Sequence, residues 1–186
     1  MTFIVCRKVP TARIAEPRDA DAAVRVLRRS IAELCVADHH NDPTTLQKWL
    51  ENKTVENFHC WLATESNFCV VTESNAEING VGLVHRAGEI LLCYVAPESQ
   101  GHGYGSAILE ALEAKARTWG LDKLRLGSTV SARLFYERHG YISAGESTCS
   151  FGSSRCYPYE KLCKLTSRLT PTREGDARGS RRTLSF

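Results

Sequence analysis

The chain has 186 residues, 42% of them hydrophobic and 24% charged, and a formal net charge of +3. That length suits one domain with a sizeable core, and that composition is ordinary for a soluble globular protein. No apolar run approaches the length of a membrane span, and residues 1–8 lack the charge order of a secretory signal, so we expect a cytoplasmic protein.

The excess of positive charge lies near the C-terminus. Residues 166–186 contain five arginines and two acids, a surplus of three that equals the net charge of the whole chain. Residues 1–165 are therefore balanced, which argues against a nucleic-acid-binding face. We expect one domain over residues 1–165, followed by a basic, flexible tail over residues 166–186.

Cysteine and histidine are scattered rather than clustered. None of the eight cysteines forms a Cys-x-x-Cys pair, so we expect reduced, mostly buried thiols that act as small apolar residues. His39 and His40 are adjacent, and adjacent residues face different ways on a helix. No metal is expected as a cofactor, and a loop or capping role is favoured for the two histidines.

The first third of the chain predicts short strands followed by helices. Residues 3–5 and 12–15 are strand candidates, and apolar residues at helical spacing follow Pro17. Asp42, followed by a proline, predicts the start of a second helix because Asp caps a first turn and Pro fits into it. Residues 54–62 form a further short helical or irregular segment.

The middle of the chain predicts a meander and a crossover. Residues 68–72, 78–85 and 89–95 are strand candidates joined by short turns, which indicates antiparallel pairing. Apolar residues at helical spacing then occupy 106–119, and residues 123–126 are again strand-like. A strand-helix-strand crossover of this length implies one parallel pair.

A glycine-rich turn lies between the last meander strand and the crossover helix. Gly101, Gly103 and Gly105 allow positive φ and carry no Cβ to hold a ligand away, so successive N–H groups can converge on one point. The start of a helix adds unpaired N–H groups and a positive dipole end. The turn is therefore a candidate phosphate or pyrophosphate site.

Spacing argues against two common phosphate-binding motifs. The chain contains no Gly-Lys pair, which a P-loop needs. A Rossmann turn needs glycine three residues after Gly103, where Ser106 stands. Leu126, near the position of the ribose-binding acid, is not acidic.

A second segment of interest is a short helix over residues 131–139. Gly140 caps it and a strand begins at Tyr141, and residues 157–163 supply a last strand candidate. Tyr136 lies on this helix, and its place on an amphipathic helix is compatible with a core position as well as a functional one.

The two segments together resemble the GNAT superfamily of N-acetyltransferases. Its acetyl-CoA loop follows the pattern Q/R-x-x-G-x-G/A, which Gln100, Gly103 and Gly105 match, and its second pattern is matched by Ala132, Tyr136, Gly140 and Tyr141. The resemblance covers roughly residues 12–163 in element order. It implies an α/β (α+β) fold: a mixed, splayed sheet of about six or seven strands flanked by helices on both faces.

The resemblance also implies a site for acetyl-CoA as cosubstrate. The amides of residues 100–106 would bind its pyrophosphate, and the N–H of Val95 would polarise the thioester carbonyl. Thr129 stands where many family members have an asparagine, so it offers one hydroxyl in place of an amide. The cofactor-binding residues expected are Tyr94, Val95, Gln100, Gly101, His102, Gly103, Tyr104, Gly105, Ser106 and Thr129.

The catalytic residues implied are Tyr136 and Glu89. Tyr136 would protonate the departing CoA thiolate, and Glu89 is the expected base, although Glu98, His85 or water could also take the proton of the amine. A base is needed because amines of the lysine type have a pKa near ~10.4.

The function expected is therefore direct acetyl transfer from acetyl-CoA to a primary amine, in a small molecule or a peptide. Polyamines, antibiotics, peptide N-termini and protein lysines all stay open as acceptors, and family members commonly place the acceptor near the segment that includes His39. The alternatives are a non-catalytic acyl-CoA-binding regulatory module and a different donor such as succinyl-CoA. The sheet edges leave a homodimer open.

Overall fold

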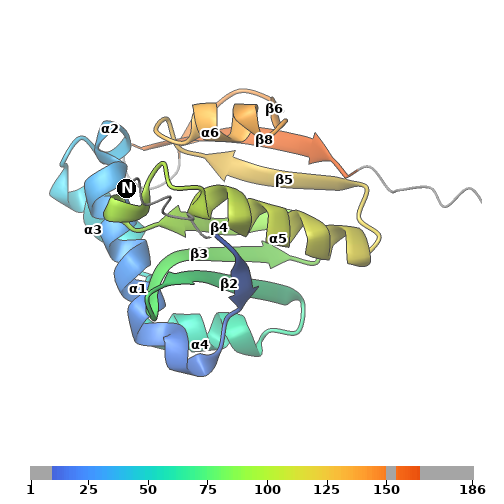
Figure 1. The fold of residues 1–186 in the computed structure, drawn as a ribbon. Coiled ribbons are helices and arrows are strands. Elements are labelled where there is room, and N and C mark those ends of the chain that lie inside the picture. The colour runs from blue at the N-terminus through green and yellow to red at the C-terminus, as the bar shows by residue number, and fades with distance from the viewer. Residues whose placement is uncertain (1–9, 150–153, 164–186) are drawn as a thin grey trace, which may run out of the picture.

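The fold is a single mixed sheet with helices on both faces, seen here in a computed structural model that describes residues 10–149 and 154–163 (Figure 1). The strands are β1 (Ala12–Ile14), β2 (Asn67–Ser74), β3 (Glu77–His85), β4 (Glu89–Val95), β5 (Lys123–Ser128), β6 (Ile142–Ser143), β7 (Thr148–Cys149) and β8 (Arg155–Leu162). Their order in the sheet is β1-β2-β3-β4-β5-β8-β6, and β7 pairs with β8. All pairs are antiparallel except β4–β5, which is the parallel pair predicted.

The helices divide between the two faces of the sheet. They are α1 (Ala20–Arg29), α2 (Val36–His39), α3 (Pro43–Leu50), α4 (Val55–Ala63), α5 (Tyr104–Thr118) and α6 (Arg133–Arg138), with a π-helical turn η2 (Ser30–Leu34) and 3-10 turns η1 (Pro17–Asp19) and η3 (Pro97–Ser99). In Figure 1, α5 crosses one face, and α1 and α4 cover the other. Each face has its own core, since Val71 and Val81 pack with α1 and α4 while Val70 and Val84 pack with α5.

The helix start predicted at Asp42 is present with its cap, since the Asp42 carboxylate accepts the N–H of Thr45 at 2.8 Å and opens α3. The segment left as helical or irregular is a helix, α4, which the Thr54 hydroxyl opens by accepting the N–H of Asn57 at 3.2 Å. These bonds satisfy helix-end donors that have no partner within the helix.

Within residues 10–149 and 154–163 the sheet has eight strands, against the six or seven expected. The two-residue strand β7 is too short to leave a sequence pattern. The β2–β3 connection is also tighter than the polar turn expected over residues 73–77. Asn75 and Ala76, with φ of 52° and 63°, make the whole turn, so both strands extend further. The strand expected over residues 3–5 lies outside the described residues.

Two glycines in β3 bring α5 close to the sheet. A Cβ on Gly80 would lie 2.7 Å from Cδ1 of Ile108, and one on Gly82 would overlap Cγ2 of the same side chain. Ile108 is fully buried in this contact. The glycines therefore set how deeply α5 seats on the strands that carry the candidate site.

The parallel pair β4–β5 opens into a fork. Its only register partners are Glu89 with Arg125 and Ile90 with Leu126. The pairing of β4 with β3 shifts at Leu91, which leaves that residue as a bulge, and a bulge bends and twists its strand. The carboxyl ends of β4 and β5 therefore diverge, as Figure 1 shows.

Candidate active site

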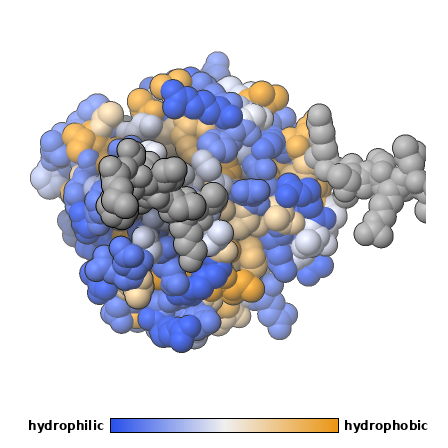
Figure 2. Space-filling model, in the orientation of Figure 1, coloured by the Kyte–Doolittle hydropathy of each residue, from blue (hydrophilic) through white to orange (hydrophobic). Residues whose placement is uncertain are grey.

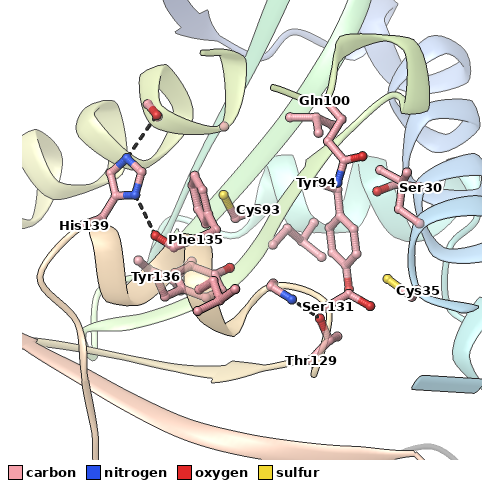
Figure 3. A pocket seen from close by; sticks show the side chains of 18 of the residues that line it. Ser30, Cys35, Cys93, Tyr94, Gln100, Thr129, Ser131, Phe135, Tyr136 and His139 are labelled. Carbon is pink, nitrogen blue, oxygen red and sulfur yellow. Dashed lines mark hydrogen bonds between the residues drawn. The ribbon is translucent and has the colours of Figure 1, made fainter. Parts of the chain in front are cut away.

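A cavity of about 590 Å³ occupies the fork (Figure 3). Its walls come from η2, β4, the glycine-rich turn, the start of α5, the end of β5 and α6. Ligands in sheets with parallel strands often bind where the carboxyl ends of neighbouring strands separate. The fold therefore places the cavity where side chains and free backbone groups from the two sides of the fork meet.

The edge of β4 that faces the fork carries free backbone groups. The N–H of Ala96 donates to the carbonyl of Asn79 at 2.8 Å, and antiparallel pairing alternates between bonded and non-bonded positions. Val95, opposite Gly80, and Cys93, opposite Gly82, are therefore non-bonded positions. Their N–H and C=O groups point away from β3, toward the open side of the fork.

The glycine-rich turn has the backbone that the sequence predicts. Gly101 and Gly103 have φ of +77° and +89°, a left-handed conformation that favours glycine, and a Cβ on Gly101 would meet nothing within 4 Å. α5 begins at Tyr104, two residues earlier than expected. Within the described part of the chain, the amides of Gly101, Gly103, Gly105 and Ser106 have no backbone acceptor, as a helix start leaves them. These amides form a site for a negatively charged group.

His139 connects α6 to this turn. Its Nδ1 lies 2.8 Å from the carbonyl of Phe135, so Nδ1 carries the hydrogen that it donates there. Nε2 lies 3.0 Å from Oγ of Ser106 and, in the neutral ring, accepts the hydroxyl hydrogen. The Ser106 hydroxyl is thereby held between the anion site and α6. Figure 3 draws the two hydrogen bonds of the His139 ring as dashed lines.

Tyr136 lies on α6 at the deep side of the cavity and is 6% exposed. Burial raises the pKa of its hydroxyl well above 10, and the nearby Cys93 thiol adds to that rise. Burial raises the pKa of Cys93 to about 12. Both groups are therefore protonated near neutral pH, and Tyr136 can give a proton to a strong base formed in the cavity.

Thr129 lies at the end of β5 and helps to open α6. Its hydroxyl oxygen accepts the N–H of Ala132 at 3.1 Å. The hydroxyl hydrogen is left to donate into the cavity that the residue lines.

The wall opposite α6 is formed by η2 and Tyr94. Ser30, Leu34 and Cys35 line it, and burial raises the pKa of Cys35 to about 12. Burial also raises the pKa of Tyr94, whose hydroxyl forms a hydrogen bond with Trp49 of α3. π-helical turns are rare and occur often at functional sites. This wall is the candidate acceptor side.

The mouth of the cavity is partly apolar. Leu91 at the β4 bulge is 44% exposed, and Leu134 on α6 is 65% exposed. Elsewhere the face in Figure 2 is largely hydrophilic, with apolar side chains in separate patches. Two large aliphatic side chains at one opening therefore favour a ligand with an apolar segment.

Most of the predicted site residues share this cavity. Those that line it are Tyr94, Val95, Gln100, Gly101, Gly103, Gly105, Ser106, Thr129 and Tyr136. Glu89, His102 and Tyr104 are not among the lining residues. Glu89 is exposed at the beginning of β4, and the ring of His102 bonds back to the carbonyl of Gln100 at 2.9 Å.

Three residues that the structure brings to the site were not predicted from the sequence. Cys93 could have been found because it precedes Val95 by two positions and so shares its face of β4. His139 follows Tyr136 by three positions and so shares its face of α6. Asp38, which bonds to the start of α6 from the other half of the chain, has no local sequence signal.

The histidine pair has the structural role that was favoured. His39 is fully buried, its Nε2 lies 3.2 Å from the carbonyl of Ile31, and its Nδ1 accepts the N–H of Asn41 at 3.1 Å. Among the described residues, no group of three or more His, Cys, Asp or Glu side chains is arranged to hold a metal ion. In the same part of the chain, no helix combines the length and apolar character needed to cross a bilayer.

The family model described as acetyltransferase (GNAT) domain matches residues 34–163. This is more than half of the chain and includes the glycine-rich turn, the fork and α6. The chain belongs to the GNAT acetyltransferase family, and the resemblance seen in the sequence is confirmed.

Solved structures share the fold. The GCN5-related N-acetyltransferase of Rhodopseudomonas palustris superposes with a TM-score of 0.74 at 19% identity, over 83% of this chain and 96% of that one. The PaiA N-acetyltransferase of Thermoplasma acidophilum, solved with coenzyme A, has a TM-score of 0.69 at 18% identity, over 83% and 99%. YncA of Salmonella typhimurium, solved with its cofactor acetyl-CoA, has a TM-score of 0.64 at 15% identity, over 86% and 97%.

One curated relative is closer in sequence over a shorter stretch. The amino-acid acetyltransferase of Pseudomonas putida (strain GB-1) is 33% identical over 79 residues, which are 42% of this chain and 18% of that protein. This chain thus matches less than a fifth of the length of that relative.

Proposed function

We propose that this chain transfers an acetyl group from acetyl-CoA directly to a primary amine. The observation that carries the proposal is the single cavity in which a glycine-rich anion site, the free edge of β4 and the Tyr136 hydroxyl converge. Acyl transfer from a thioester needs these three features: a place for the phosphates, donors for the carbonyl oxygen, and an acid for the leaving sulfur.

The residues present fit acetyl-CoA. The free amides of Gly101, Gly103, Gly105 and Ser106 at the start of α5 would hold the pyrophosphate. The amides of Gln100 and His102, also expected there, instead donate to the carbonyls of Pro97 and Ser99. The pantetheine amides would pair with the fork-side edge of β4 as an added strand does. The N–H groups of Val95 and Cys93 are the donors on that edge available to polarise the thioester carbonyl.

The chemistry balances with groups of this chain. The neutral amine nitrogen attacks the carbonyl carbon, the C–N bond forms, and the C–S bond breaks. Tyr136 gives its hydroxyl proton to the departing sulfur and is reprotonated by solvent after release. The proton lost by the amine passes to Glu89 or to water, and Glu89, outside the cavity lining, would act through water.

The acceptor is proposed to be a small-molecule or peptide amine. The Pseudomonas putida relative is called an amino-acid acetyltransferase, which makes L-amino acids the first group to screen. The wall formed by Ser30, Leu34 and Cys35 would hold the acceptor opposite Tyr136.

The test removes only the proposed acid. Tyr136→Phe keeps the ring and its packing against Phe135 and Tyr141. We expect kcat to fall about 100-fold, the scale typical of a lost general acid, with acetyl-CoA affinity within about twofold. The release of free thiol from acetyl-CoA, with L-amino acids, a peptide with a free N-terminus and spermidine as acceptors, measures kcat.

Two results would count against this function. Full activity of Tyr136→Phe from pH 6 to 9 would remove the acid assignment. Saturable acetyl-CoA binding by the wild type without thiol release for any amine would favour the non-catalytic acyl-CoA-binding module.

A further inference from the structure

Asp38 is a buried carboxylate that joins the two walls of the cavity. It lies on α2 and is 3% exposed. Its Oδ1 accepts the N–H of Val130 at 2.6 Å, and its Oδ2 accepts the Ser131 hydroxyl at 2.7 Å and the Ser131 N–H at 3.3 Å. A buried carboxylate is stable only when its oxygens are bonded, so these three bonds tie α2 to residues more than 90 positions away.

The residues that Asp38 holds are those that open α6. Val130 and Ser131 precede Ala132, whose carbonyl accepts the N–H of Tyr136 at 3.2 Å in the first turn of the helix. α6 has only six residues, too few to be stable without contacts at its ends. The place of its first turn therefore decides where the Tyr136 hydroxyl lies.

The hydrogen bonds of Asp38, which we call the Asp38 bridge, join the two sides of the fork beyond the point where β4 and β5 are paired. Backbone pairing between β4 and β5 ends at Ile90 and Leu126, so the sheet does not fix the spacing of the two walls beyond that point. Asp38 lies three residues after Cys35, where the acceptor-side wall ends, and it bonds to the loop that begins the Tyr136 side. Cys35 and Ser131 both line the cavity (Figure 3).

We propose that Asp38 is a positioning residue that sets the distance between the bound amine and the Tyr136 hydroxyl. The inference rests on the proposed acetyl transfer. Asp38 touches no reacting atom and acts through Val130 and Ser131. Without the charge of Asp38, α6 and the acceptor wall would still fold, but they would fix the distance between the bound amine and the Tyr136 hydroxyl less closely. A misplacement of about 1 Å can lower a rate about 100-fold.

The experiment compares two substitutions of the same kind. Asp38→Asn removes the bridging charge. Asp42→Asn removes the charge from the aspartate that caps the start of α3, which accepts the N–H of Thr45 at 2.8 Å and does not line the cavity. Ser131→Ala removes only the hydroxyl bond. For each variant we would measure kcat, the KM for acetyl-CoA, the midpoint of thermal unfolding and amide hydrogen exchange at residues 130–139, using the amine that the wild type acetylates fastest.

The inference predicts a selective effect on kcat. Asp38→Asn should lower kcat about 10- to 100-fold with the KM for acetyl-CoA within about threefold, and Ser131→Ala should lower kcat less. Asp42→Asn should keep kcat within about twofold of the wild type, even if its midpoint of thermal unfolding falls as far as that of Asp38→Asn. Amide hydrogen exchange at Val130 and Ser131 should accelerate in Asp38→Asn and Ser131→Ala but not in Asp42→Asn.

Two results would overturn the inference. One is a kcat for Asp38→Asn within twofold of that for Asp42→Asn. The other is unchanged exchange at Val130 and Ser131 in Asp38→Asn, which would show that the carboxylate does not hold the loop. The exchange measurement needs no turnover, so it tests the bridge even if the wild type acetylates no amine, a result that would refute the proposed function instead.

Discussion

Lys53, between α3 and α4, is a cation held in a dry environment. It is 5% exposed, it bonds to Asn52 Oδ1, and its Nζ lies 6.0 Å from the ring centre of Trp61. Burial lowers its pKa from 10.5 to about 8. Between these two values the unfolded chain binds more protons than the folded chain, so the free energy of unfolding should rise with pH from about 8 to 10.5.

Lys53→Met should remove that rise. Below pH 8 the penalty for the buried charge is constant, so the variant should also unfold at a higher temperature than the wild type at pH 7. Urea unfolding at several pH values measures the slope, and Lys48→Met, at an exposed lysine of α3, is the control. A slope that persists unchanged in Lys53→Met would assign the effect to another group.

At the scale of single residues, the sequence predicted the groups that a local pattern marks. The glycines of the turn were found by their spacing and Tyr136 through the family resemblance, and all of them border the cavity. The bonds from Asp38 to Ser131 and from His139 to Ser106 join residues that lie 93 and 33 positions apart. Their proximity depends on where the fork opens, and no single-residue pattern encodes that.

At the scale of elements, the glycine-rich turn permits a matched comparison of two glycines. Gly101 in the turn and Gly120 after α5 have φ of +77° and +70°, and a Cβ would meet nothing within 4 Å at either position. Alanine should therefore cost about 1–2 kcal/mol of stability at both sites, through the backbone alone. Only Gly101 lines the cavity.

Gly101→Ala should weaken acetyl-CoA binding at least tenfold, because its amide and its conformation belong to the anion site. Gly120→Ala should lose similar stability and bind acetyl-CoA as the wild type does. Titration calorimetry gives the two dissociation constants, and urea unfolding gives the two stabilities. Equal affinities in the two variants would mean that this part of the turn does not hold the ligand.

Elements with chemical end signals were predicted well. The cap Asp42 marked the start of α3, and Gly120 marked the end of α5, to within a few residues. The segment over residues 54–62, left as helical or irregular, is the helix α4. The π-helical turn Ser30–Leu34 was not predicted, because its apolar residues at positions 31 and 34 continue the spacing of α1. The spacing of apolar residues alone does not distinguish a π-helical turn, which takes in one extra residue, from a turn of a regular α-helix.

At the scale of the whole molecule, the strands of the sheet are paired without interruption at one end, and β4 and β5 separate into a fork at the other. The meander β2–β3–β4 and the pair β5–β8 are joined through two paired positions of β4 and β5. The crossover length predicted that the pair is parallel. The extent of the fork follows from the Leu91 bulge, which depends on how β3 and β4 settle into register and leaves no mark in the sequence.

Thermal unfolding during a titration with acetyl-CoA, beside matched titrations with NAD and ATP, tests the central claim most directly. A ligand bound only by the folded protein stabilises it by about 2.7 kcal/mol at a concentration 100 times its Kd. The account predicts a midpoint that rises with acetyl-CoA in the manner of a single site and stays constant with NAD and ATP. No rise with acetyl-CoA, in protein shown by circular dichroism to be folded, would contradict it.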